Sequence, residues 1–173
     1  CGFSINSFEP DPIHIAVFQE NIINNKSTKI TINQKAISDK SGSMDFIRVL
    51  GNTTGSHLAG AKEDPYGELE TFSVETSDIN AVLLNNDFVK MDIEGQEATA
   101  ILSTKKDTWA NVEMILEVGT EKNAKIIFEY LNEINVNMFA QKTGWNKVSD
   151  LADVPTSYKE GSLFLSVADE MSW

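Results

Sequence analysis

The chain has 173 residues, of which 26 are acidic and 14 are basic, and its net charge is −12. This excess of negative charge repels phosphate backbones, so we expect no nucleic-acid partner. No apolar run reaches the roughly 18 residues of a membrane span, and no secretory signal peptide is visible. The one cysteine, Cys1, cannot form an internal disulfide. We therefore expect a single cytoplasmic globular domain over residues 1–173, without membrane association.

The start of the chain predicts a strand followed by a helix. Residues 3–8 alternate apolar and polar side chains, which predicts the strand. Asp11 as N-cap and Pro12 in the first turn predict a helix that ends near residue 24. Glu9 stands at the carboxyl end of the strand, where a carboxylate can accept hydrogen bonds from both hydroxyls of a ribose. An ordinary exposed loop acid is the alternative.

The next part of the chain combines strand patterns with polar segments. Strands are predicted at 29–37 and 44–50, separated by a polar turn at 38–42, and residues 35–50 are compatible with a hairpin. Residues 51–70 predict a long polar loop, and long loops in compact domains are usually functional or disordered. His57 in this loop could act as a general base, because an unperturbed imidazole titrates near pH ~6.5. A solvated loop histidine is the alternative.

Strands and helices alternate through the second half of the chain. The patterns predict strands at 70–75, 88–93, 114–118, 136–141 and 162–167, and helices at 79–84, from Gly95 onward and at 121–135. This alternation predicts an α/β fold with a mostly parallel, Rossmann-like sheet and helices on both faces. No convincing long helix separates the last two strands, so we expect an antiparallel C-terminal strand.

The buried strand at 88–93 delivers acidic residues to its carboxyl end. Asp92 and Glu94 are one residue apart and therefore point the same way from a strand, at the edge where ligands bind in open α/β sheets. The alternative is that they start and cap the following helix. Glu117 ends the next strand and is a further candidate. Asp92 and Glu94 could hold a divalent cation, but no third ligand follows at a fixed spacing, so no metal is predicted.

Four segments occur in a characteristic order: FEPDP at 8–12, KAISDKSG at 35–42, KMDIEGQE at 90–97 and ILEVG at 115–119. In this order the chain resembles the FkbM family of S-adenosylmethionine-dependent O-methyltransferases, over roughly its first two thirds. The resemblance implies S-adenosylmethionine as cofactor and methyl transfer to a hydroxyl. It also implies a sugar, glycan or small metabolite as the acceptor.

The resemblance also assigns roles to particular positions. It implies ribose binding by Glu9, adenine contacts from Ala36, Ile37 and Ser38, cofactor binding and catalysis by Asp92, catalysis by Glu94, and an acceptor contact from Ser56. The residue type of His57 and the strand-end position of Glu117 make these two residues further candidates for contacts to the acceptor. The catalytic role is to accept the proton of the acceptor hydroxyl or to hold that hydroxyl in place.

One part of the family pattern is missing. The glycine-rich loop that cradles the methionine part of the cofactor should precede Phe3, together with a central strand of the sheet. The segment GNTTGS at 51–56 does not follow a buried strand and open a helix, so it is no substitute. We therefore expect residues 1–173 alone to bind S-adenosylmethionine weakly and to be less stable than a domain of their size. Two alternatives remain: a catalytically inactive methyltransferase-like binding module or fragment, and another Rossmann-like nucleotide-using enzyme.

Overall fold

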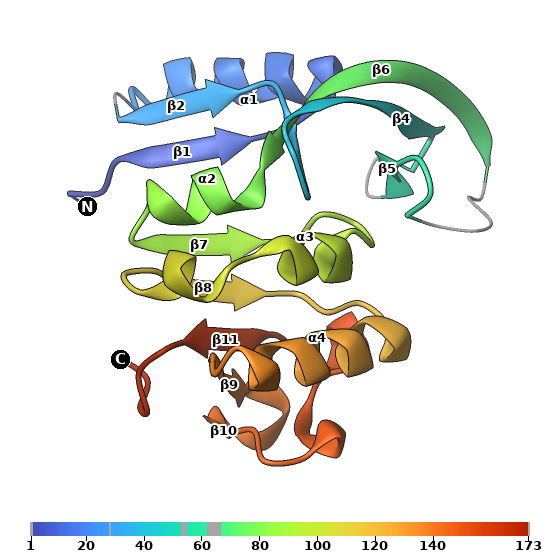
Figure 1. Cartoon of the computed structure of the whole chain (residues 1–173). Helices are drawn as coiled ribbons and strands as arrows, with labels where there is room; N and C mark the ends of the chain where they lie inside the picture. Colours follow the sequence, from blue (N-terminus) through green and yellow to red (C-terminus); the bar gives the residue numbers. More distant parts are fainter. Residues whose placement is uncertain (1, 28, 53–54, 62–66, 173) are drawn as a thin grey trace. The chain divides into compact units, whose positions relative to one another are not determined.

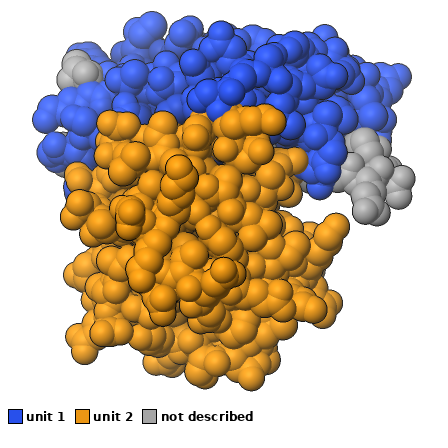
Figure 2. Space-filling view, viewed as in Figure 1, with its two compact units in different colours: residues 1–37, 41–77 blue, residues 38–40, 78–173 orange. Residues whose placement is uncertain are grey.

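The computed structural model describes residues 2–27, 29–52, 55–61 and 67–172. The fold is mixed α/β, and the chain divides into two compact units (Figure 2). Unit 1 comprises residues 1–37 and 41–77, and unit 2 comprises residues 38–40 and 78–173. Among the described residues, no helix combines the length and the apolar character needed to cross a bilayer.

Unit 1 begins with two parallel strands joined by a helix (Figure 1). Strand β1 (Ile5–Phe8) pairs in register with β2 (Ile30–Asn33). Helix α1 (Pro12–Asn24) connects them and begins as the sequence predicts, because the Asp11 side chain accepts a hydrogen bond from the backbone N–H of Ile13. Proline suits the first helical position, since its missing N–H would be unpaired there in any case.

Unit 1 also contains a four-stranded sheet in the order β3-β6-β4-β5, apart from the strand-end residues Ser38 and Asp78, which belong to unit 2. Its strands are β3 (Ala36–Ser38), β4 (Gly42–Leu50), β5 (His57–Leu58) and β6 (Glu68–Asp78). The long strands β4 and β6 are antiparallel and run side by side (Figure 1). Ala36, Phe46, Leu58 and Val74 form a buried cluster in this unit, with Met44 and Phe72 packed against it.

Unit 2 contains a five-stranded sheet in the order β10-β9-β11-β8-β7. Its strands are β7 (Phe88–Met91), β8 (Glu113–Leu116), β9 (Asn137–Ala140), β10 (Asn146–Lys147) and β11 (Leu163–Ser166). Its α-helices are α2 (Ile79–Leu84), α3 (Glu97–Ser103) and α4 (Glu121–Glu133). Short 3₁₀ helices follow at η2 (Lys106–Trp109), η3 (Gln141–Thr143), η4 (Leu151–Asp153) and η5 (Tyr158–Glu160).

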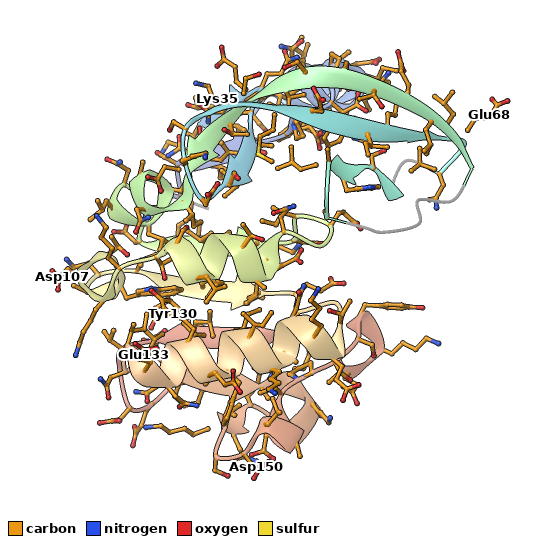
Figure 3. All side chains as sticks on the ribbon, turned by 45° about the vertical axis from the view of Figure 1, so that its right-hand side comes forward. Lys35, Glu68, Asp107, Tyr130, Glu133 and Asp150 are labelled. Atoms are coloured by element: carbon orange, nitrogen blue, oxygen red, sulfur yellow. The ribbon has the colours of Figure 1, made fainter. Side chains whose placement is uncertain are left out.

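Helix α4 packs one face into the core of unit 2. Ile127 and Leu131 are fully buried, as the helical spacing of apolar residues predicts. Tyr130 is half-buried and its hydroxyl donates a hydrogen bond to the Thr104 carbonyl, whereas Glu133 is exposed (Figure 3). Thr104 in turn accepts a hydrogen bond from the buried Trp109 indole at 3.0 Å, so the polar edges of both aromatic side chains are satisfied.

The described sheets are mixed rather than mostly parallel, which corrects the expected sheet. Only β1–β2 and β7–β8 are parallel among the strand pairs whose register is described, and the antiparallel pairs are β4–β5, β4–β6, β8–β11, β9–β10 and β9–β11. Antiparallel neighbours can be joined by a short connection, as between β9 and β10, whereas a parallel pair needs a crossover, which α1 supplies between β1 and β2. The C-terminal strand β11 is antiparallel to both neighbours, as predicted.

Candidate active site

Two neighbouring parallel strands of unit 2 end in acidic residues. β7 and β8 run in register, and the backbone N–H of Glu117 continues the ladder by donating to the Met91 carbonyl at 3.1 Å. Asp92 and Glu117 therefore leave adjacent strands at the same edge. Burial raises the pKa of Glu117, the negative charges of Asp92 and Glu94 raise it further, and Lys90 opposes them. The sequence-predicted acids Asp92, Glu94 and Glu117 thus share one electrostatic neighbourhood.

Asp92 and Glu94 lie in the turn between β7 and α3 and do not cap the helix. The N-cap of α3 is Gln96, so the capping alternative for Asp92 and Glu94 is wrong. The Asp92 side chain is 37% exposed, and its Oδ2 lies 3.4 Å from the Lys90 ammonium. Glu94 and Gly95 follow each other with positive φ angles of 56° and 104°. A non-glycine residue at positive φ is uncommon and is often associated with functional turns.

Glu97, the last residue of the KMDIEGQE segment, is a buried carboxylate that supports this turn. It is 3% exposed. Its Oε1 accepts a hydrogen bond from the backbone N–H of Ile93 at 3.0 Å, and both oxygens accept from the N–H of Gly95. Asn123 of α4 donates to Oε2 at 3.3 Å. Burial is the largest influence on Glu97 and raises its pKa, while its backbone hydrogen bonds oppose that rise.

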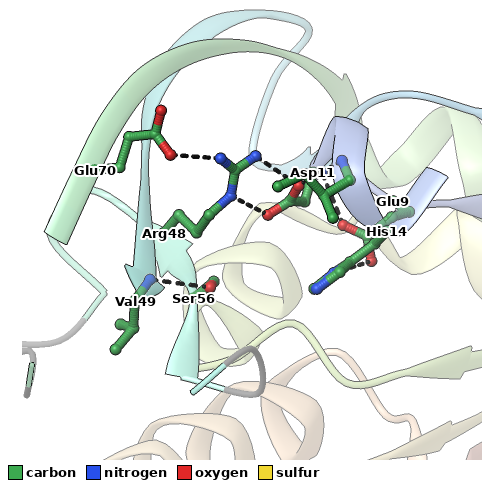
Figure 4. Close-up of polar contacts among 8 residues, drawn as sticks. Glu9, Asp11, His14, Arg48, Val49, Ser56 and Glu70 are labelled. Atoms are coloured by element: carbon green, nitrogen blue, oxygen red, sulfur yellow. Dashed lines mark hydrogen bonds and ion pairs between the residues drawn. The ribbon is translucent and has the colours of Figure 1, made fainter. Parts of the chain in front are cut away.

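Glu9 of unit 1 follows β1, as predicted, and is half-buried. Its backbone N–H donates to the Asn33 carbonyl at 3.1 Å and so extends the β1–β2 ladder. Its Oε1 accepts a hydrogen bond from the Asp11 N–H at 2.8 Å, and its Oε2 lies 3.6 Å from His14 Nδ1 (Figure 4). The Glu9 carboxylate is therefore held by its own turn through one oxygen, and Oε2 retains capacity to accept a further hydrogen bond.

An ion-pair network behind this turn was not anticipated from the sequence. Asp11 is 1% exposed and is bound by Arg48 of β4 through two contacts of 2.7 Å each (Figure 4). The same guanidinium pairs with Glu70 of β6 and lies 4.6 Å from the centre of the Phe72 ring. Burial, the largest single influence, raises the pKa of Asp11, but the hydrogen bonds from Arg48 and Ile13 together lower it below its ordinary value.

The predicted adenine-contacting residues form strand β3. Ala36, Ile37 and Ser38 are all buried, and the Ser38 hydroxyl donates to Asp39 Oδ1 at 3.0 Å. Their side chains therefore contribute to packing. Nothing in the described contacts tests a role in cofactor binding, which stays a prediction.

The predicted acceptor-side residues Ser56 and His57 are buried, so the alternative of a solvated loop histidine is wrong for His57. Ser56 is 7% exposed, and its hydroxyl accepts a hydrogen bond from the Val49 N–H at 3.2 Å. His57 is 1% exposed and belongs to β5, which pairs with β4. Its Nδ1 lies 2.8 Å from the Gly55 carbonyl and must carry the hydrogen, while Nε2 has no hydrogen-bond partner among the described residues. Both residues are thus held against β4, His57 by the pairing of β5 and Ser56 by the hydrogen bond from Val49.

The predicted site residues are divided between the two units. Glu9, Ser56 and His57 belong to unit 1, and Asp92, Glu94 and Glu117 belong to unit 2. Within the described ranges, no group of three or more His, Cys, Asp or Glu side chains is arranged to hold a metal ion.

In open α/β sheets ligands generally bind beyond the carboxyl ends of the strands, which is where Asp92 and Glu117 stand. The family model for the methyltransferase FkbM domain matches residues 1–147, so the chain belongs to the FkbM methyltransferase family. The crystal structure of methyltransferase FkbM from Methylobacillus flagellatus KT is similar in fold, with a TM-score of 0.50 and 15% sequence identity over 94% of this chain. This chain spans only 36% of that protein's length. A comparison with the curated proteins finds no match.

Proposed function

We propose that the full-length protein is an S-adenosylmethionine-dependent O-methyltransferase that acts on a hydroxyl of a sugar, a glycan or a small metabolite. The proposal includes a Rossmann-like arrangement of the cofactor-binding part and no nucleic-acid partner. The observation that carries it is the side-by-side position of Asp92 and Glu117 at the ends of β7 and β8, with Glu94 in the adjoining turn. Membership of the FkbM methyltransferase family supports the reaction class.

In this proposal the acids of unit 2 handle the acceptor hydroxyl. S-adenosylmethionine supplies the methyl group when bound. The carbon–sulfur bond breaks as the carbon–oxygen bond forms, and the hydroxyl proton must leave in the same reaction. Asp92 or Glu94 accepts that proton, and Glu117 positions the acceptor by hydrogen bonding. The negative charge of these residues also favours a cationic sulfonium near this edge.

The test is methyl transfer by the full-length protein from isotopically labelled S-adenosylmethionine to a panel of hydroxylated sugars and metabolites. Formation of S-adenosylhomocysteine together with a labelled acceptor is the expected result. Cofactor binding without turnover on any acceptor would instead indicate the inactive binding module. Tight binding of a different nucleotide, with none of S-adenosylmethionine, would contradict the proposal.

The proposed ribose contact of Glu9 predicts a measurable change in cofactor affinity. In Glu9→Gln the remaining amide oxygen still accepts from the Asp11 N–H, but the other oxygen becomes an amide donor. Loss of a charged hydrogen bond should weaken S-adenosylmethionine binding about tenfold. Calorimetry on the full-length protein measures this, and Glu20→Gln, an exposed acid on α1, is the matched control. Unchanged affinity in Glu9→Gln would remove Glu9 from the ribose site.

A further inference from the structure

The turn between β7 and α3 has backbone donors that the strand and the helix do not use. Glu94 and Gly95 have positive φ angles and turn the chain away from the strand. The N–H groups of Ile93 and Gly95 both point toward Glu97 Oε1. Buried backbone donors need acceptors. The Glu97 carboxylate supplies them, with contacts of 3.0 and 3.1 Å, from the first residue of α3.

The same carboxylate connects this turn to the segment that follows β8. Asn123 Nδ2 donates to Glu97 Oε2 at 3.3 Å and to the Val118 carbonyl at 3.2 Å. Asn123 is itself fixed, because its backbone N–H donates to the hydroxyl of Thr120, the N-cap of α4. Val118 directly follows Glu117. A chain of hydrogen bonds within unit 2 therefore joins the backbone that carries Asp92 and Glu94 to the backbone that carries Glu117.

The hydrogen bonds around Glu97 suit a carboxylate. Three N–H donors converge on two oxygens, and a carboxylate accepts all of them. Glutamine at position 97 would turn one acceptor into a donor that faces another N–H group. A charge at 3% exposure is costly, and these hydrogen bonds offset part of the cost while burial still raises the pKa of Glu97. With both oxygens engaged, Glu97 has no role left in direct contact with a substrate.

We propose that Glu97 is a positioning residue that, through Ile93, Gly95 and Asn123, holds the acids at the ends of β7 and β8 at a fixed spacing. The inference rests on the proposed function, since it assigns the spacing of those acids to methyl transfer. Misplacement of a catalytic group by about 1 Å can reduce a rate about 100-fold. Glu97 therefore acts on the reaction through the position of Asp92, Glu94 and Glu117.

The first experiment compares Glu97→Gln with wild type in the full-length protein, with Glu121→Gln as control. Glu121 is an exposed acid in the first turn of α4, so its replacement removes the same charge nearby without touching the turn. We expect kcat for methyl transfer to fall about 100-fold in Glu97→Gln, with KM for S-adenosylmethionine little changed. If Glu97 had a purely structural role, Glu97→Gln would lower the melting temperature but would not lower kcat selectively with KM unchanged.

The second readout does not require activity. Burial is the largest influence that raises the pKa of Glu117, and the charges of Asp92 and Glu94 raise it further while Lys90 lowers it, so that pKa depends in part on how close these groups are held. NMR titration of labelled Glu117 should show its pKa moving toward the ordinary value in Glu97→Gln and staying raised in Glu121→Gln. If the protein transfers no methyl group, the proposed function fails, while this titration still tests the positioning role.

The variant Asn123→Ala tests the link from Glu97 to the segment after β8 separately from the hydrogen bonds within the β7–α3 turn. It also keeps the proposal testable if Glu97→Gln does not fold. It removes the link to Val118 and leaves the hydrogen bonds from Ile93 and Gly95 to Glu97 in place. We expect the Glu117 titration to shift in the same direction and kcat to fall less than in Glu97→Gln. Wild-type kcat and an unchanged Glu117 pKa in the folded variants would overturn the proposal.

Discussion

Replacing Arg48 with methionine should lower the free energy of unfolding by about 3 kcal/mol, the lower end of the range for breaking a buried ion pair. Methionine retains the apolar length of the side chain but leaves Asp11, which is 1% exposed, without its two 2.7 Å contacts. The effect stays at the lower end because Glu70, the other partner of Arg48, is half exposed and loses little. Urea denaturation of the full-length protein measures the change.

The control for this prediction is an ion pair on the surface of the same unit. Lys35 and Glu75 are 3.0 Å apart but largely exposed, so Lys35→Met should cost about 0–1 kcal/mol. In the double variant Asp11→Asn with Arg48→Met, the buried charge is gone and asparagine still caps α1, so more than half of the loss should be recovered. A cost below about 1 kcal/mol for Arg48→Met alone would show that the variant does not leave Asp11 as an unpaired buried charge.

The Asp11 carboxylate also predicts how stability depends on pH. Its folded-state pKa lies below the ordinary value of 3.8, so its contribution is present above that pH and is lost as the pH falls through the folded pKa. The difference in unfolding free energy between wild type and Asp11→Asn should therefore be largest near neutral pH and narrow below pH 3.8. Denaturation curves of both proteins between pH 7 and pH 2 measure it. If the difference in unfolding free energy stayed constant across this pH range, the stability contribution would not come from the ionised Asp11 carboxylate.

Local signals in the sequence predicted most of the elements, but β7 and β8 end two residues before the predicted strand ends, and β3 pairs with β6 instead of forming a hairpin with β4. The Asp11 cap and Pro12 place the start of α1 correctly, because capping depends on residues within one turn. The apolar strand before Asp92 and the strand before Glu117 were also predicted, and both acids do leave parallel neighbours at one edge. Such patterns are readable because the side-chain period and the caps are properties of a few consecutive residues.

Contacts between distant residues were not readable in the same way. Asp11 and Arg48 are 37 positions apart, and Glu97 and Asn123 are 26 apart, so no local pattern connects either pair. The predicted loop fails at His57 for a similar reason, since His57 belongs to β5 and pairs with β4. The expected sheet fails because local patterns specify where strands are but leave their partners and directions open.

Asp92→Asn should reduce methyl transfer far more than it reduces stability. Removing a group that takes up the acceptor proton costs about 10²–10⁴-fold in rate. The stability change should stay within about 0.5 kcal/mol, because the side chain is 37% exposed and its Lys90 contact is a surface ion pair. Kinetics of the full-length protein and its melting temperature measure the two effects together. Glu94→Gln, assayed in parallel, distinguishes which of the two acids accepts the proton.

Asp87→Asn is the matched control, because Asp87 is an exposed aspartate that precedes the same strand at its opposite end. It should keep wild-type turnover, since ligand chemistry in such sheets lies beyond the carboxyl ends of the strands. The charge change has an independent check in the pKa of Glu117, which burial raises most and the charge of Asp92 raises further. That pKa should fall in Asp92→Asn and stay unchanged in Asp87→Asn. Full activity in Asp92→Asn, or parallel loss of activity and of the folded state, would make the carboxylate structural and exclude it from catalysis.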